Sequence, residues 1–146
     1  MKIFIGSDRI GYELKGQIIL SLVKNGHEVI DIGPFEYKSV HYPEIAVAVS
    51  QSVLKNESAF GVLICSTGIG MAITANKIKG IRAANCTGVY TARHSRLHND
   101  ANILCLGSSV VKFKNAIKMI DKFLFTPFEG GKHTIRVKMI NDIERL

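Results

Sequence analysis

The chain has 146 residues, of which 47% are hydrophobic, and its formal net charge is +7 at pH 7. This length and composition predict one globular domain over residues 1–146, and no apolar run reaches the roughly 18 residues of a membrane-spanning helix, so we expect no membrane partner. The N-terminus lacks a secretory signal pattern and the three cysteines form no CxxC pair, which argues against a disulfide framework or structural zinc site and favours the reducing cytoplasm.

Apolar runs and helical patterns alternate along the chain. In order, the pattern predicts a strand at 2–6, a helix at 11–25, a strand at 28–32, a loop at 33–41 and a helix that begins at Pro43. It then predicts strands at 60–65, 82–86 and 103–106 alternating with helices at 70–78, 89–97 and 112–125, and a last helix at 133–145. The last helix follows Gly130-Gly131 and has nothing obvious left to pack on within one subunit, so we expect it to reach a partner subunit.

This alternation predicts a Rossmann-like α/β fold, a doubly wound five-stranded parallel sheet with helices on both faces. In such folds ligands bind beyond the carboxyl ends of the strands. That rule gathers residues 7–9, 65–70, 86–87 and 107–109 at one edge of the sheet, which we call the rim.

The run from Gly61 to Gly70 carries the strongest sign of chemistry. It predicts a buried strand that ends on Cys65, a turn of small residues that includes Thr67, and a helix that starts near Gly70. The first turn of a helix has N–H groups without internal partners and carries partial positive charge, which favours a phosphate, an enediolate or a thiolate. The pattern therefore indicates proton transfer by a cysteine beside a stabilised oxyanion, although a free cysteine is more often a small buried hydrophobic residue.

The other two cysteines are weaker candidates, since Cys105 lies within a predicted strand and Cys86 ends one near the rim. The run Gly68-Ile69-Gly70 is not a dinucleotide fingerprint, because Ile73 stands where GxGxxG needs a glycine, and no GxxxxGK[ST] motif is present. Its glycines fit either a ligand that approaches the backbone or an ordinary tight turn. We therefore expect no nucleotide cofactor.

Two other side-chain types suit acid–base or binding roles. His98 follows the predicted helix at 89–97, which we expect to open toward the rim, and histidine suits acid–base work near neutral pH. His94 and His98 also have the i, i+4 spacing of metal ligands, but no third ligand set stands out, so we expect no metal. Asp8 could orient a sugar hydroxyl or cap the next helix.

The basic residues have several interpretations. Arg9, Lys132 and Arg136 are candidates for binding a phosphate, although each taken singly fits a solvent-exposed position. Lys132 and Arg136 are one helical turn apart and could converge on one anion. The chain has no nucleic-acid-binding motif and no run of consecutive basic residues, so we expect no nucleic-acid partner.

Eight short motifs occur in order along nearly the whole chain. They are Gly6-Ser-Asp8, His41-Tyr-Pro43, Ile64-Cys-Ser-Thr-Gly-Ile-Gly70, Ala75-Asn-Lys77, Gly80-Ile-Arg82, Ser95-Arg-Leu-His-Asn-Asp100, Asn102-Ile-Leu104 and Gly130-Gly-Lys-His133. Together they resemble the ribose-5-phosphate isomerase B family, which also includes galactose-6-phosphate isomerase subunits. The cysteine–Thr-Gly-x-Gly element combined with the His-Asn-Asp element is specific.

The resemblance implies a sugar-phosphate isomerase that needs no metal or nucleotide and forms a homodimer or tetramer with active sites shared between subunits. It implies that Cys65 moves a proton between C2 and C1 of the open-chain sugar with help from Thr67, while His98 promotes ring opening. Substrate contacts are implied for the backbone N–H groups of Ser66, Gly68, Ile69 and Gly70 and for the side chains of Asp8, Tyr42 and Asn99. The phosphate is implied to bind Lys132 and Arg136 of the partner subunit.

Four positions depart from the family pattern. Arg9 stands where the family has His, Ser109 and Lys132 where it has Arg, and Ser66 where it has Gly. We hypothesise that Arg9 replaces the charge missing at Ser109, which could shift the preference toward another aldose or ketose phosphate. Ser66 adds a side chain beside the expected oxyanion site.

These observations predict an isomerase of ribose 5-phosphate and ribulose 5-phosphate that works through a cysteine and an enediolate. One alternative is an isomerase of a six-carbon sugar phosphate, such as allose or galactose 6-phosphate. Another is a non-catalytic sugar-phosphate-binding protein, against which the joint presence of Cys65, Thr67 and His98 argues. A basic nucleic-acid binder is a third.

Overall fold

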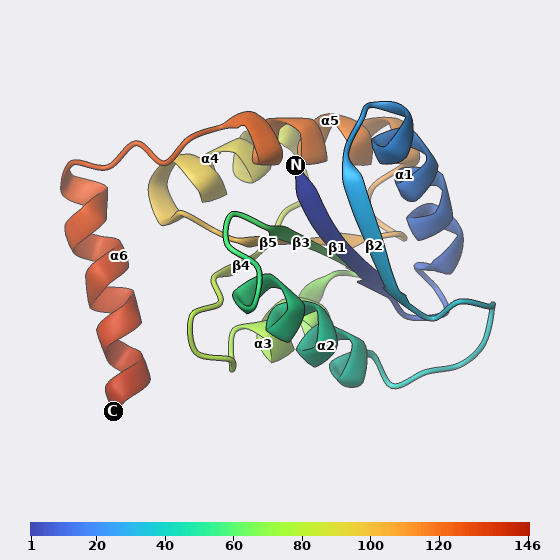
Figure 1. The fold of residues 1–146 in the computed structure, drawn as a ribbon, viewed down its shortest axis with the longest axis horizontal. Helices are drawn as coiled ribbons and strands as arrows, with labels where there is room; N and C mark the ends of the chain where they lie inside the picture. Colours follow the sequence, from blue (N-terminus) through green and yellow to red (C-terminus); the bar gives the residue numbers. More distant parts are fainter.

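The computed structural model describes residues 1–146 as a five-stranded parallel sheet between two layers of helices, with a last helix to one side (Figure 1). In chain order the elements are β1 (Lys2–Ser7), α1 (Tyr12–Lys24), β2 (Glu28–Gly33), α2 (Tyr42–Leu54), β3 (Phe60–Cys65), α3 (Ile69–Ala75), β4 (Ala83–Asn85), α4 (Val89–Asn99), β5 (Ile103–Gly107), α5 (Phe113–Phe125), α6 (Lys132–Asp142) and the 3₁₀ turn η1 (Ile143–Arg145). Every predicted element is present, which confirms the α/β class. No helix is long and apolar enough to span a bilayer.

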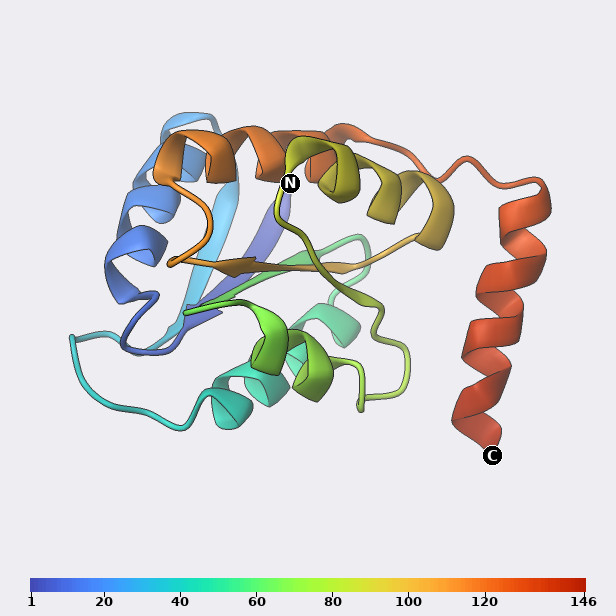
Figure 2. The same cartoon turned by 180° about the vertical axis from the view of Figure 1, so that it is seen from behind.

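The strands lie in the order β2-β1-β3-β5-β4, and every neighbouring pair is parallel. Helices α1, α4 and α5 cover one face of the sheet and α2 and α3 cover the other, as Figures 1 and 2 show from opposite sides. The chain therefore leaves β1 toward one face and β3 toward the other. Loops that part in this way open a crevice at the carboxyl ends of the strands. In this sheet the rule places the crevice at the rim between β1 and β3.

Strand β3 is buried along almost its whole length, which explains its nearly continuous apolar sequence. Successive residues of a strand point to opposite faces. Ile64 accordingly packs in the core beneath α1 and α5, whereas Leu63 and Cys65 pack in the core on the side of α2 and α3. The alternation thus aims the Cys65 side chain to the α2–α3 side of the rim.

Helix α6 stands apart from the rest of the molecule in both views (Figures 1 and 2). Only His133 and Val137 of this helix are buried. The 3₁₀ turn that follows is tied to the body by the Glu144 carboxylate, which accepts the Gly80 N–H at 2.7 Å. Large apolar side chains are exposed along this segment, namely Ile135, Met139, Ile140 and Ile143.

Candidate active site

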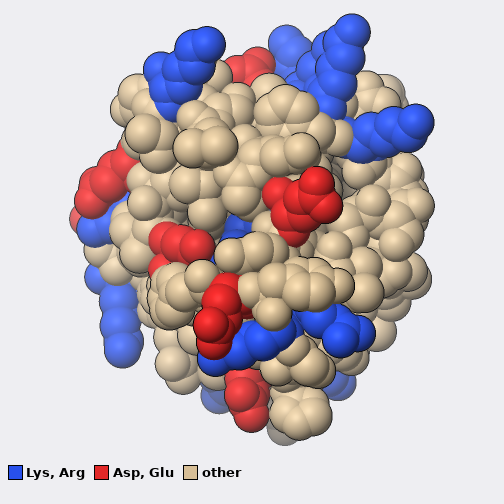
Figure 3. Space-filling model, turned by 90° about the vertical axis from the view of Figure 1, so that its right-hand side faces the viewer, with Lys and Arg blue, Asp and Glu red and all other residues tan.

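The loops after β1, β3 and β5 meet at the rim, which is the side of the molecule that Figure 3 faces. Acidic and basic side chains lie among each other on this side. The loops pack too closely to admit extra atoms, since a Cβ on Gly107 would lie 2.6 Å from the backbone of Thr67 and one on Gly11 would lie 2.7 Å from Ile64. Packing this tight holds the loop at 66–70 in one place.

Cys65 is the last residue of β3 and is buried, with 6% of its surface exposed. Its sulfur accepts the N–H of Gly68 at 3.1 Å. Gly68 adopts a φ of +82°, a left-handed conformation that glycine reaches without steric cost. This turn folds the chain back over the sulfur and directs a backbone donor at it.

Several backbone N–H groups beside the thiol have no partner within the chain. Those of Ser66, Thr67 and Gly70 make no hydrogen bond, and the Ser66 carbonyl accepts the N–H of Ser109 at 3.0 Å instead of closing a helical turn with Gly70. Helix α3 has only seven residues, so the unpaired N–H groups matter more than its dipole. An oxyanion that forms beside Cys65 would find these donors already in place.

Four hydroxyl-bearing side chains lie in or next to the same loop. The Thr67 hydroxyl is exposed and accepts a backbone N–H two residues further on at 3.2 Å. The Tyr42 ring covers Gly70, where a Cβ would lie 2.6 Å from the ring. The hydroxyls of Ser66 and Ser109 lie 3.0 Å apart. Ser66 and Thr67 of the loop and the neighbouring Tyr42 and Ser109 therefore gather four hydroxyl groups at the rim.

Asp8 and Arg9 follow β1, on the other side of the crevice. One carboxylate oxygen of Asp8 accepts the Gly11 N–H at 2.8 Å, at the turn into α1, and the other makes no hydrogen bond within the chain. The capping and the substrate-binding interpretations of Asp8 are therefore compatible. Arg9 is exposed, and its guanidinium lies 6.0 Å from the centre of the Tyr37 ring. Both residues lie at the same edge of the sheet as Cys65.

The prediction that His98 opens toward the rim is wrong within one chain. Helix α4 runs back along the sheet, so its last residues lie near the amino ends of the strands, where the Asn102 carbonyl accepts the Gly61 N–H at 2.9 Å. The part of β3 from Gly61 to Cys65 covers about 13 Å and separates the two edges. Asn99 also lies at this amino edge. The prediction overlooked that a helix between parallel strands ends at the edge opposite to the one where it starts.

The remaining predicted residues, Lys132 and Arg136, are exposed on α6, which contacts α4 at the same amino edge. The predicted site residues therefore form two groups on opposite edges of the sheet. The rim group is Asp8, Arg9, Tyr42, Cys65, Ser66, Thr67, Gly68, Ile69 and Gly70. The amino-edge group is His98, Asn99, Lys132 and Arg136.

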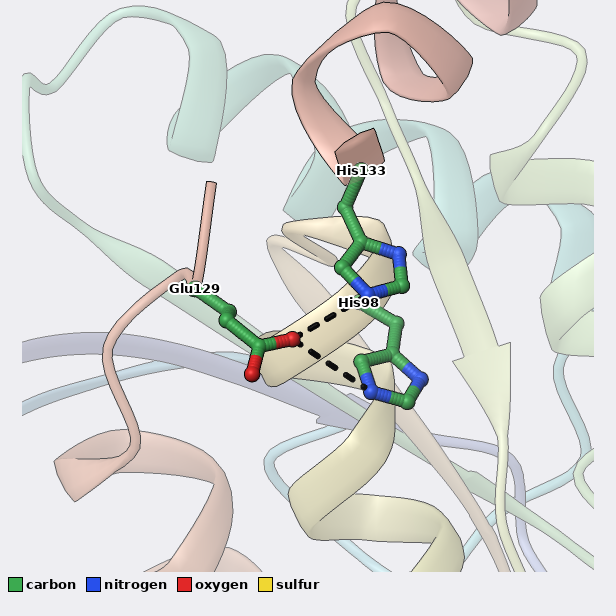
Figure 4. Close-up of side chains that lie close together, drawn as sticks. All are labelled: His98, Glu129 and His133. Carbon is green, nitrogen blue, oxygen red and sulfur yellow. Dashed lines mark ion pairs between the residues drawn. The ribbon is translucent and has the colours of Figure 1, made fainter. Parts of the chain in front are cut away.

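His98 belongs to a cluster at the amino edge that the sequence analysis missed. The Glu129 carboxylate lies 3.1 Å from Nε2 of His133 and 3.7 Å from Nε2 of His98 (Figure 4). The two imidazole rings stack, with centres 4.2 Å apart and planes 11° apart. Partial burial, followed by the charges of His133 and His94, lowers the pKa of His98, and Glu129 acts in the opposite direction. The i, i+4 spacing of Glu129 and His133 was the only signal in the sequence.

These three side chains carry the donor atoms of a metal site, within 4.8 Å of one another. Their orientation does not fit a single ion, because a metal lies in the ring plane of each imidazole that binds it. Two nearly parallel, stacked rings with centres 4.2 Å apart have no such point in common. The cluster is arranged for charge interactions rather than for a metal.

Known proteins resemble this chain over almost its whole length, and the model of the Ribose/Galactose Isomerase family matches residues 3–140. Ribose-5-phosphate isomerase B of Escherichia coli is 44% identical over 144 residues, which are 99% of this chain and 97% of that protein. The solved structure of ribose-5-phosphate isomerase B from Clostridium thermocellum is 49% identical with a TM-score of 0.96, covering 99% of this chain and 98% of that one. The enzyme from Mycoplasma genitalium with bound ribulose-5-phosphate is 40% identical with a TM-score of 0.95, covering 99% and 96%. Because the family model covers most of the chain and these relatives align with nearly all of it, this chain belongs to the ribose/galactose isomerase family.

Proposed function

We propose that this chain interconverts ribose 5-phosphate and ribulose 5-phosphate. The relatives support this substrate, since the Escherichia coli protein carries its name and the Mycoplasma genitalium protein holds ribulose-5-phosphate. The observation that carries the proposal is the buried Cys65 thiol beside unpaired backbone N–H groups at the rim. Abstraction of a proton from carbon needs a base and donors for the oxyanion that forms. All three cysteines are free, which suits the reducing cytoplasm that we propose for the enzyme.

In the proposed reaction, the Cys65 thiolate takes the proton from C2 of the open-chain aldose. The electron pair of that bond forms the C1=C2 double bond of an enediolate, and the negative charge moves to O1. The unpaired N–H groups of Ser66, Thr67 and Gly70 would donate hydrogen bonds to that oxygen. The proton then returns from sulfur to C1, and the O2 proton passes to O1 with the Thr67 hydroxyl as relay. A carbonyl at C2 results.

Because the two groups of predicted residues lie on opposite edges of one chain, we propose that two copies build each site. One copy would supply its rim and the other its amino edge. His98 would open the sugar ring there, and Asn99 would hold a sugar hydroxyl. Lys132 and Arg136 would bind the phosphate. The apolar side chains exposed on α6 are suited to packing against the second copy, and a two-fold arrangement would create two equivalent sites in a dimer or tetramer.

Mixing two impaired variants tests the shared site. Chains with Cys65→Ala keep His98 and chains with His98→Asn keep Cys65, so a heterodimer refolded from both contains one site with both residues intact. Random assembly makes half of the dimers mixed, and about one quarter of the wild-type activity should return. A mixture no more active than the variants alone would show that each site lies within one chain.

A six-carbon sugar phosphate is the second candidate substrate. Ser109 is much shorter than the arginine of the family pattern, which leaves space at the rim, and Arg9 offers a charge from the other side of the crevice. A phosphate that binds Arg9 would sit differently and could suit a longer sugar. This candidate rests on the same thiol and the same proton transfer.

A panel of five- and six-carbon aldose phosphates, including ribose, allose and galactose phosphates, decides between the two substrates. We expect ribose 5-phosphate to react fastest and Cys65→Ala to abolish the reaction while the fold is kept. Cys105→Ala is the matched control, because this cysteine is fully buried within β5 and burial raises the pKa of its thiol strongly. Full activity in Cys65→Ala would refute the thiol mechanism, and preference for a hexose phosphate would favour the second candidate.

A further inference from the structure

The cluster of His98, Glu129 and His133 is held together from two directions. The Glu129 N–H donates to the Leu97 carbonyl at 3.0 Å, so the backbone of Glu129 is tied to the last turn of α4, next to His98. The His133 ring is nearly fully buried, and its Nε2 lies 3.1 Å from the Glu129 carboxylate. His98 is freer, with 40% of its side chain exposed. The backbone tie to Leu97 and the contact with the buried His133 thus place the Glu129 carboxylate, itself half exposed, beside His98.

The carboxylate selects the nitrogen that carries hydrogen in each imidazole. Nε2 of His133 lies 3.1 Å from the Glu129 carboxylate, and an ionised carboxylate favours hydrogen on the ring nitrogen beside it. Nε2 of His98 faces the same oxygen at 3.7 Å (Figure 4). In neutral His98 this favours hydrogen on Nε2 and leaves Nδ1 without one. With hydrogen on Nε2, Nδ1 of His98 is the nitrogen that can accept a proton from a sugar hydroxyl.

The charges around His98 also identify Glu129 as its stabilising partner. The titratable and charged groups that face His98 are His94 of α4, His133 and Lys132 of α6, and Glu129 from the segment between the helices. Burial and the first three groups lower the pKa of His98, and only Glu129 raises it. Glu129 is therefore the one neighbour that stabilises the imidazolium of His98.

We propose that Glu129 is a positioning residue for the opening of the sugar ring, which keeps hydrogen on Nε2 of His98 and stabilises its imidazolium, with His133 holding the carboxylate in place. This inference rests on the proposed isomerase function. In ring opening, Nδ1 of His98 takes the proton of the O1 hydroxyl, the O1 electron pair forms the C1 carbonyl, and the C1–O4 bond breaks. The imidazolium then gives the proton to O4, which becomes a hydroxyl group.

Ribulose 5-phosphate separates ring opening from proton transfer, because its phosphorylated O5 cannot close a ring. Uptake of deuterium from D₂O at C1 of this ketose needs Cys65 but not the His98 cluster. We expect Glu129→Gln to lower kcat for ribose 5-phosphate by at least ~10-fold, a part of the roughly 10²–10⁴-fold that acid–base catalysis supplies, while deuterium uptake keeps its rate. His98→Asn should show the same split, and the double variant should be no slower than His98→Asn alone.

Glu144→Gln is the matched control, because Glu144 belongs to the same C-terminal segment but holds the Gly80 N–H and not His98. It should leave both rates unchanged. ¹⁵N NMR of the substrate-free protein adds a readout that does not depend on catalysis. We expect hydrogen on Nε2 of His98 in the wild type, and in Glu129→Gln a lower pKa and a mixture of both neutral forms.

Equal losses of ring opening and deuterium uptake in Glu129→Gln would assign the residue a structural role and overturn the inference. Unchanged kcat and unchanged His98 resonances would overturn it as well. A wild-type protein that performs neither reaction would refute the proposed function and the ring-opening role with it. A failure of the Glu129 inference alone would leave the wild-type activity intact, so the two failures are distinguishable.

Discussion

The close approach of Gly107 to Thr67 predicts that one added methyl group will damage both stability and catalysis. A Cβ on Gly107 would lie 2.7 Å from the Cα of Thr67, whereas ordinary contacts begin at 3.4 Å, so the Thr67 backbone must move by about 0.7 Å. Overpacking of this kind costs about 1–3 kcal/mol of folding free energy. A misplacement approaching 1 Å next to the reacting atoms costs on the order of 10²-fold in rate. We therefore expect Gly107→Ala to lose stability by the first amount and kcat/KM by the second.

The assay compares Gly107→Ala with Gly16→Ala, the same change at an exposed position of α1 where a Cβ meets nothing within 4 Å. Gly16→Ala should raise the free energy of unfolding by about 1 kcal/mol, because alanine favours a helix, and should leave kcat/KM unchanged. Urea denaturation gives the free energy of unfolding, and isomerisation of ribose 5-phosphate gives kcat/KM. A Gly107→Ala protein as stable and as active as the wild type would refute the tight packing of the rim loops.

Three further changes test other parts of the structure. The buried Lys15 ammonium lies 2.8 Å from the Asp31 carboxylate. Lys15→Met should lower the free energy of unfolding, measured in urea, by about 2–3 kcal/mol, which is less than for a fully buried pair because Asp31 is partly exposed. A loss under ~1 kcal/mol would contradict this. Burial and then the N-terminal ammonium lower the pKa of His27, so the unfolded chain binds the proton more readily than the folded one. The contribution of His27 to stability should thus be full above about pH 6.5 and fall as the pH drops through the lowered pKa of the folded state. In thermal melts, the stability of His27→Gln should fall less steeply with decreasing pH than that of the wild type. An unchanged slope would exclude His27 as the source of this pH dependence. Arg9→Ala should weaken the binding of inorganic phosphate by about 10- to 150-fold in calorimetry, since a charge-assisted hydrogen bond contributes about 1.5–3 kcal/mol. An unchanged affinity would remove Arg9 from the phosphate site.

The fold was predictable because apolar residues recur in its helices and strands at the spacing that packing against a neighbouring layer requires. In α1 the apolar residues Leu14, Ile18 and Leu22 recur every four residues, and all three are buried against the sheet. Strand β4 shows the limit of this reasoning, since it is shorter than the predicted 82–86. It pairs only with β5, and Arg82 before it turns away to donate to the Asp100 carbonyl at 2.8 Å. Propensity places such an edge strand but does not set its length.

The rim group was predictable from topology, because parallel strands place their carboxyl ends at one edge whatever their order. The amino-edge cluster was not, because it depends on how α6 returns after Gly130 and Gly131, both of which have positive φ. The spacing of apolar residues in the sequence does not predict the direction that the chain takes after two such glycines. Glu129 and His133 could therefore be recognised as neighbours of His98 only from the packed structure.

The two edges offer different surroundings for the two proton transfers of the proposed reaction. Removal of a proton from carbon benefits from a site without water and with fixed donors, which describes Cys65 at the closely packed rim. Ring opening needs a group that both takes and gives a proton, which describes the partly exposed His98 beside the Glu129 carboxylate. Within one chain the two surroundings lie at opposite edges of the sheet, separated by the length of β3, which is about 13 Å from Gly61 to Cys65. In the assembly that we propose, the second copy brings them together, and the open-chain aldehyde would form only where Cys65 is present to convert it.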